Sequence, residues 1–133
     1  MKNTKLWKKT LITLFAIQIL FAIAISSMAA IDFSLFAENF GFTAQPTMGI
    51  LQHITVYNMF LSGGICVLGI IWIRKDNIAG YQAAMLLGTL MFLVSFIVAI
   101  KFDRVDMLFI DSIRAIIMAV LGYLGYRVLK SKN

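Results

Sequence analysis

Three long stretches of this 133-residue chain carry no charged side chain: 10–31, 39–73 and 77–100. A helix needs about 20 mostly apolar residues to cross the ~30 Å hydrocarbon core of a bilayer. A fourth apolar stretch, 107–126, contains two charges, Asp111 and Arg114. The sequence therefore predicts an all-α fold. We expect one integral membrane domain, 1–133, with transmembrane helices at about 11–30, 47–73, 78–100 and 107–126.

The composition supports a membrane protein, and the single cysteine excludes several kinds of cysteine chemistry. Hydrophobic residues make up 61% of the chain and charged residues 14%, whereas charged residues are about 25% of soluble domains. The single cysteine, Cys66, excludes an intrachain disulfide, a CxxC redox pair and a cysteine zinc site within one chain. We interpret Cys66 as a small packing residue inside the second span.

The basic residues are distributed unevenly between the span ends. Two of them, Lys101 and Arg104, lie in the loop between the third and fourth spans. Nine others lie at ends that an N-in, C-in topology places in the cytoplasm, which is the positive-inside bias: Lys2, Lys5, Lys8, Lys9, Arg74, Lys75, Arg127, Lys130 and Lys132. The net charge of +6 is therefore expected to set orientation and attract anionic membrane lipids, and no nucleic-acid partner is predicted.

The N-terminal region has two interpretations. A basic tail, 1–10, leads into the apolar stretch 11–30, which we expect to be a retained transmembrane helix. Its basic start, apolar middle and small residues Ser26 to Ala30 also fit a cleaved signal peptide. Gln18 is the one strongly polar residue inside this stretch, and we expect it to hydrogen-bond a neighbouring helix.

The segment 31–47 is predicted to contain a short amphipathic helix. Phe33, Phe36, Ala37 and Phe40 recur at the spacing of one helix face. We expect this helix to lie in the outer membrane interface, with its phenylalanines in the acyl boundary. The alternative is a lid over a pocket that opens from the outer leaflet.

Small residues predict where helices pack closely. Gly80, Ala84 and Gly88 follow one another at four-residue spacing in the third span, and Ala115, Ala119 and Gly122 lie in the fourth. Lipid supplies no hydrophobic drive between helices, so small residues that admit close backbone approach mark interfaces. We interpret both rows as packing surfaces.

Polar residues near the outer ends of the second and fourth spans form the candidate binding site. They are Gln52, His53 and Tyr57 on one helix and Asp111 and Arg114 on the other. The spacing of Asp111 and Arg114 puts them on one helix face, where they could form a self-neutralising structural pair. Alternatively, all five residues line an outward-facing polar pocket, because charges at membrane depth usually face the bundle or a wet cavity. No catalytic residue, metal site or cofactor is predicted.

The overall pattern resembles the DoxX-like group and related small four-helix bacterial membrane proteins. The shared traits are the outer segment with Phe40-Gly41-Phe42, the second-span sequence Leu61-Ser62-Gly63-Gly64, and the charged start of the fourth span, Asp111 to Ala115. This resemblance implies a location in the bacterial inner membrane. Some members of the group are similar to accessory subunits of redox or efflux systems.

Three functions follow as hypotheses. The first is a non-enzymatic accessory or scaffold protein that binds lipid or the helices of a partner, including a second copy. The second is a small dimeric transporter with Asp111 as its intramembrane acid, although such exporters conventionally carry that acid in the first span. The third is a membrane enzyme acting on lipid or quinone, with His53 and Asp111 as an acid–base pair.

Overall fold

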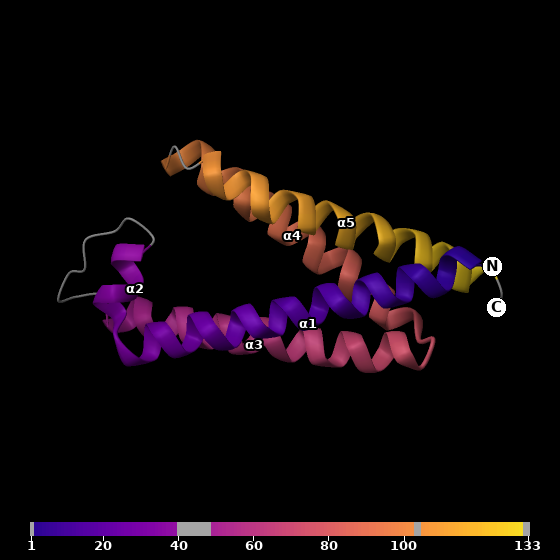
Figure 1. The fold of residues 1–133 in the computed structure, drawn as a ribbon, viewed down its shortest axis with the longest axis horizontal. Coiled ribbons are helices and arrows are strands. Elements are labelled where there is room, and N and C mark those ends of the chain that lie inside the picture. Colours follow the sequence, from indigo (N-terminus) through magenta and orange to yellow (C-terminus); the bar gives the residue numbers. More distant parts are fainter. Residues whose placement is uncertain (1, 40–48, 103–104, 132–133) are drawn as a thin grey trace. The chain divides into compact units, whose positions relative to one another are not determined.

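The computed structural model describes residues 2–39, 49–102 and 105–131, and these residues are almost entirely helical (Figure 1). The helices are α1 (Lys2–Ile31), α2 (Phe33–Asn39), α3 (Gly49–Arg74), α4 (Ile78–Phe102) and α5 (Val105–Lys130). Four of them are long and apolar enough to cross a membrane, over Thr4–Ile31, Gln52–Arg74, Ile78–Ile97 and Asp111–Lys130. The predicted all-α class with four potential spans is confirmed.

The helix of the first span includes the basic tail, because α1 runs from Lys2 to Ile31 without a break. This segment contains neither glycine nor proline, and its lysines are good helix formers, so a helix nucleated in the apolar part extends at little cost. The start of the membrane span itself at about residue 11 stays a prediction. The predicted start of the second span, at residue 47, and the motif residues 40–42 lie outside the described residues.

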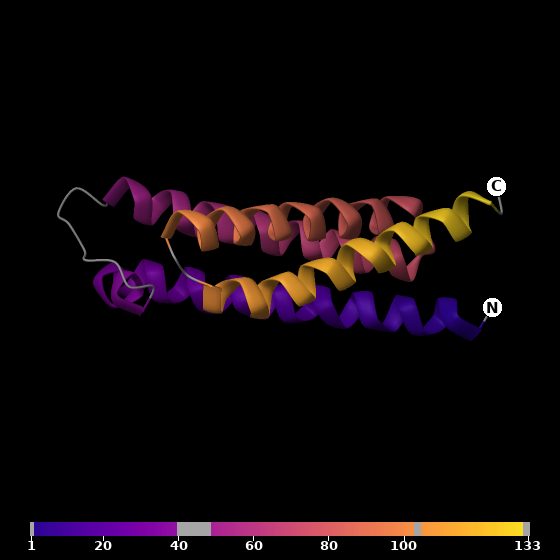
Figure 2. The same cartoon turned by 90° about the horizontal axis from the view of Figure 1, so that it is seen from above.

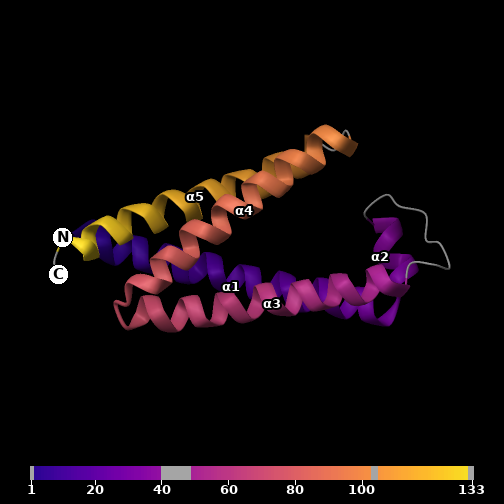
Figure 3. The ribbon, with the colours of Figure 1, turned by 180° about the vertical axis from the view of Figure 1, so that it is seen from behind.

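The chain divides into two compact units. The first contains residues 1–15 and 68–133, and the second contains residues 16–67. In the first unit, the start of α1, the α3–α4 turn and the end of α5 lie together at one end (Figures 2 and 3).

In the first unit, α4 and α5 pack against each other through glycines (Figure 1). A Cβ atom on Gly88 would lie 2.5 Å from the Ala115 carbonyl oxygen, and one on Gly122 would lie 2.6 Å from the Met85 nitrogen. Since those neighbours are backbone atoms, the two helices approach as closely as glycine allows. The predicted packing rows are confirmed at Gly88, Ala115 and Gly122, whereas Gly80 packs against Ile73 at the end of α3.

A tight turn joins α3 to α4 in the same unit. Its hydrogen bonds run from the Asp76 amide to the Ile73 carbonyl and from the Asn77 amide to the Trp72 carbonyl, the pattern of a Schellman C-cap. Asp76 has the left-handed conformation of that motif, with φ of 53°. The Asn77 side chain then accepts a hydrogen bond from the Ala79 amide at 2.9 Å, which begins α4 as an N-cap.

The second unit pairs the later part of α1 with the earlier part of α3. The Gln18 amide donates to the Ser62 hydroxyl at 3.4 Å, so the predicted interhelical hydrogen bond of Gln18 is confirmed. Ala22 faces Gly63, whose Cβ position lies 3.4 Å from the Cβ of Ala22. Buried positions on α1 recur every three or four residues, as in a coiled-coil seam: Leu11, Phe15, Gln18, Ala22, Ser26 and Ala29. Cys66, as predicted, is buried within α3.

The short helix α2 follows α1 after one residue, Asp32. The Asp32 carboxylate accepts hydrogen bonds from the Ser34 hydroxyl at 2.5 Å and the Leu35 amide at 3.1 Å. These bonds lower the pKa of Asp32, with the Ser34 bond as the larger cause, because they stabilise the charged carboxylate. Ala37 is buried and Glu38 is exposed, while the position of α2 in a membrane interface stays a prediction.

Candidate functional site

The two charges of the fourth span form an ion pair on α5. The Arg114 Nη2 atom donates to the Asp111 Oδ1 atom at 2.7 Å, and the side chains are 16% and 42% exposed respectively. The i, i+3 spacing allows this pair within one helix. Each charge therefore has an opposite charge on its own helix, as the structural interpretation requires.

Gln52 links α3 to the end of α1. Its side-chain amide donates to the Ala29 carbonyl at 2.8 Å and approaches the Ala30 carbonyl at 3.4 Å. The last carbonyls of a helix have no partner within the helix. Gln52 supplies hydrogen bonds to carbonyls that would be costly to leave unpaired in hydrocarbon. Gln52 therefore has a structural role, which is to hold α3 to the end of α1.

His53 and Tyr57 lie on a different face of α3 from the one that packs on α1. Both are exposed, Tyr57 to 68%, and Asn58 beside them is exposed as well. Phe60 lies one turn after Tyr57 and Gly64 lies two turns after it, and both are exposed. A Cβ atom on Gly64 would meet nothing within 4 Å. This surface, His53, Tyr57, Phe60 and Gly64, is called the His53 face below.

The five predicted site residues are distributed over both units. Gln52, His53 and Tyr57 belong to residues 16–67, and Asp111 and Arg114 belong to the other unit. Within its own unit, each group has the contacts described above. Their assembly into one outward-facing pocket stays a prediction.

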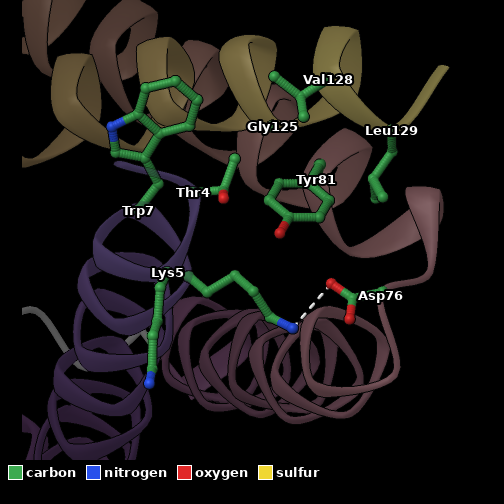
Figure 4. A pocket seen from close by; sticks show the side chains of 9 residues that line it. Thr4, Lys5, Trp7, Asp76, Tyr81, Gly125, Val128 and Leu129 are labelled. Atoms are coloured by element: carbon green, nitrogen blue, oxygen red, sulfur yellow. Dashed lines mark hydrogen bonds and ion pairs between the residues drawn. The ribbon is translucent and has the colours of Figure 1, made fainter. Parts of the chain in front are cut away.

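A cavity of about 470 Å³ lies in the first unit, between the start of α1, the α3–α4 turn and the end of α5 (Figure 4). Its polar part is formed by Thr4, Lys5 and Lys8 of α1, Asp76 of the α3–α4 turn, and Tyr81 of α4. Trp7 and the last turns of α5, with Gly125, Val128 and Leu129, supply its apolar part. Sequence analysis did not identify this site.

The cavity is organised by contacts between residues far apart in the sequence. Lys8 Nζ donates to Asp76 Oδ1 at 2.7 Å, across 68 positions. The Tyr81 ring lies against Gly125, where a Cβ atom would be 2.1 Å from a ring carbon, so glycine is needed to admit it. The Tyr81 hydroxyl points into the space between Thr4 and Asp76 (Figure 4). The sequence signal was the opposite charge of Lys8 and Asp76, both at predicted cytoplasmic span ends.

Among the described residues, no three His, Cys, Asp or Glu side chains are grouped closely enough to hold a metal ion. Comparison of the sequence with known protein families, curated proteins and solved structures finds no match. The resemblance to the DoxX-like group therefore stays a prediction. The fold and the geometry above remain the basis for any functional conclusion.

Proposed function

We propose that this multi-pass chain is a non-enzymatic accessory or scaffold protein that binds membrane lipid and the helix of a partner protein. The observation that carries the proposal is the His53 face of α3. It exposes two polar side chains and a glycine within the potential span Gln52–Arg74. Polar side chains facing hydrocarbon are costly, and they gain hydrogen bonds when another helix covers them.

The pattern of this surface matches that of helix interfaces in membranes. Such interfaces combine small residues, which let backbones approach, with polar residues that hydrogen-bond across the contact. Gly64 supplies the first property, while His53 and Tyr57 supply the second. Many other exposed positions of α3 are apolar, including Ile54, Leu61 and Leu68, and fit contact with acyl chains.

The buried polar residues of the spans support the same function. Gln18 and Gln52 bond a neighbouring helix, and Asp111 and Arg114 bond each other. These bonds hold the fold together, although the Gln18 Oε1, Ser26 Oγ and Ser112 Oγ atoms are buried without a hydrogen-bond partner among the described residues. A transporter with Asp111 as its acid would have to separate Asp111 from Arg114 in each cycle.

The test is site-specific photocrosslinking in native membranes. A benzophenone amino acid in place of Tyr57 is expected to give a crosslink to another polypeptide. The matched control places the same amino acid at Leu20, which is 67% exposed on α1 of the same unit, and is expected to crosslink lipid.

The identity of the crosslinked product decides the proposal. A product between residue 57 and a second polypeptide, a further copy of this chain included, supports it. A product within one chain, to residues 78–130, would show that the protein covers this face itself. Crosslinks to lipid alone from residue 57 would also overturn partner binding.

A further inference from the structure

We propose that the cavity between the start of α1, the α3–α4 turn and the end of α5 binds the phosphate of an anionic phospholipid. Lys8 is its principal ligand, and Asp76 is the group that holds Lys8 when no lipid is bound. The inference deepens the proposed lipid binding and rests on it. It does not depend on a partner helix at the His53 face.

The place of the cavity in the fold suits a lipid headgroup. The potential spans begin at Thr4 and Ile78 and end at Lys130, so the cavity lies at the level where three helices leave the hydrocarbon. Trp7 and Tyr81 line it, and such amphipathic rings favour that boundary. The volume of about 470 Å³ is within the usual range for ligand pockets, about 300–1,000 Å³.

The donors around the cavity match a phosphate. Lys8 carries an ammonium group, and Thr4 and Tyr81 carry hydroxyls, whereas the Lys5 ammonium points away from Asp76 and Tyr81 (Figure 4). Hydrogen bonds from ammonium to phosphate oxygens are charge-assisted and stronger than neutral ones. The apolar side chains of Val128 and Leu129 at the same cavity give the glycerol backbone and the first acyl carbons a surface to contact.

The charge balance of this end of the unit favours an anion. Asp76 is the one acidic residue in the described parts of α1 residues 2–15, the α3–α4 turn and the last three turns of α5. The basic residues in those segments outnumber it: Lys2, Lys5, Lys8, Lys9, Arg74, Lys75, Arg127 and Lys130. Basic groups close to a membrane surface attract anionic lipid.

The Lys8–Asp76 ion pair is weak enough for a phosphate to replace Asp76 as the partner of Lys8. The Lys8 and Asp76 side chains are 26% and 59% exposed, and ion pairs with such access to solvent are weak. A phosphate therefore competes successfully for Lys8. The left-handed backbone at Asp76 fixes the direction of its short side chain from the turn, while the long lysine side chain moves between the two acceptors.

The experiment uses the fluorescence of Trp7 in the full-length protein. Trp72 is replaced, Trp72→Phe, so that Trp7 is the one remaining tryptophan. The protein is placed in phosphatidylcholine nanodiscs that contain a minor fraction of phosphatidylglycerol brominated near the headgroup. Quenching of Trp7 is compared with that by brominated phosphatidylcholine at the same fraction, and we expect a clear preference for the anionic lipid.

Two variants with matched controls test the named residues. Lys8→Gln is expected to weaken the preference about tenfold or more, as loss of a hydrogen bond to a charged group does. Lys9→Gln removes the same charge from an exposed residue that does not line the cavity, and long-range attraction predicts at most about a fivefold loss. Asp76→Asn removes the competing carboxylate and keeps a residue that is tolerated in the left-handed conformation. We expect it to strengthen binding about threefold or more. Its control, Glu38→Gln, also removes one carboxylate and is expected to leave binding unchanged.

The outcomes separate the proposal from its rivals. Equal effects of Lys8→Gln and Lys9→Gln would show diffuse attraction to the basic surface without a binding site. Weaker binding in Asp76→Asn would show that the headgroup needs the carboxylate, as one bearing an amine would. Full displacement of the lipid by millimolar glycerol phosphate would identify a soluble phosphate as ligand. Each of these results overturns the proposal, and none of them affects the crosslinking result at residue 57.

Discussion

The α4–α5 pair and the α1–α3 pair of this protein are held together by different means. Between α4 and α5, Gly88 and Gly122 bring backbone against backbone. Between α1 and α3 in residues 16–67, side-chain hydrogen bonds from Gln18 and Gln52 cross the contact. Helices in lipid associate through close packing or through polar contacts, and here each mechanism dominates one pair. The two contacts should therefore respond to different substitutions.

The largest effect is expected from added volume at the α4–α5 contact. In Gly88→Ala, the new Cβ atom would meet the Ala115 oxygen and the Ala119 nitrogen at 2.5 and 2.6 Å. Backbone atoms cannot rotate away, so the helices must separate, at a cost of about 1–3 kcal/mol. Unfolding in mixed micelles, followed by circular dichroism, measures the loss.

Two other glycines calibrate that result. Gly69→Ala places its Cβ atom 2.6 Å from the Phe15 ring, and an intermediate loss is expected because a side chain adjusts more easily than backbone. Gly64→Ala meets nothing within 4 Å and is expected to change unfolding by less than about 0.5 kcal/mol. Equal losses at Gly88 and Gly64 would show that close approach does not hold α4 to α5.

The next effect concerns the ion pair on α5. Asp111→Asn leaves Arg114 without its carboxylate partner, and we expect a loss of about 1–3 kcal/mol in the free energy of unfolding. The double variant with Arg114→Gln is expected to recover part of that loss, since it removes both charges. A thermodynamic cycle of the four proteins measures the coupling, and a coupling of zero would remove the structural interpretation and leave the pocket hypothesis.

A smaller effect is expected at the polar contacts of α1 with α3. Gln18→Leu and Ser62→Ala both remove the same interhelical hydrogen bond of 3.4 Å, and such bonds contribute about 0.6 kcal/mol on average in a membrane protein. Gln52→Leu should cost more, because its bond to Ala29 is 2.8 Å long. The same micelle unfolding assay ranks the three variants, and a cost for Gln18→Leu as large as that for Gly88→Ala would reverse the comparison.

The smallest effect is the pH response of α2. Hydrogen bonds from Ser34 and Leu35 lower the pKa of Asp32, so its stabilising contribution is complete above the ordinary aspartate pKa of about 3.9. It is lost as the pH falls through the lower pKa of the folded state. The protection factor of the Leu35 amide, its exchange rate relative to the intrinsic rate at the same pH, should fall over that range and should fall far less in Asp32→Asn. An identical acid response in both proteins would rule out Asp32 as the cap.

Sequence reasoning succeeded where residue type and spacing along one helix were enough for the prediction. The four spans follow from charge-free length, and the Asp111–Arg114 pair follows from i, i+3 spacing. Gln18 and the glycine rows were interpreted correctly because lipid leaves polar and small residues few other uses. The helical state of the basic tail was not predicted from sequence, and α1 includes it from Lys2 onward because lysine is a good helix former whose amine reaches water.

The cavity near Lys8 was missed for a different reason. Its lining comes from α1, the α3–α4 turn, α4 and α5, and no local pattern relates Thr4 to Tyr81 or Gly125. Likewise, no spacing indicated that Gln52 would bond the end of α1. Sequence analysis had grouped Gln52 with His53 because both are polar neighbours, yet a helix turns about 100° per residue and gives adjacent side chains different surroundings.

The sequence by itself determined that this protein has four helices able to cross a membrane, because length and hydrophobicity act along each segment separately. The tertiary structure decided which side chains meet: Lys8 with Asp76, Gln52 with Ala29, and Tyr81 with Gly125. Those contacts depend on which helix faces lie together and at what register. That choice is made by packing and hydrogen bonding between distant segments.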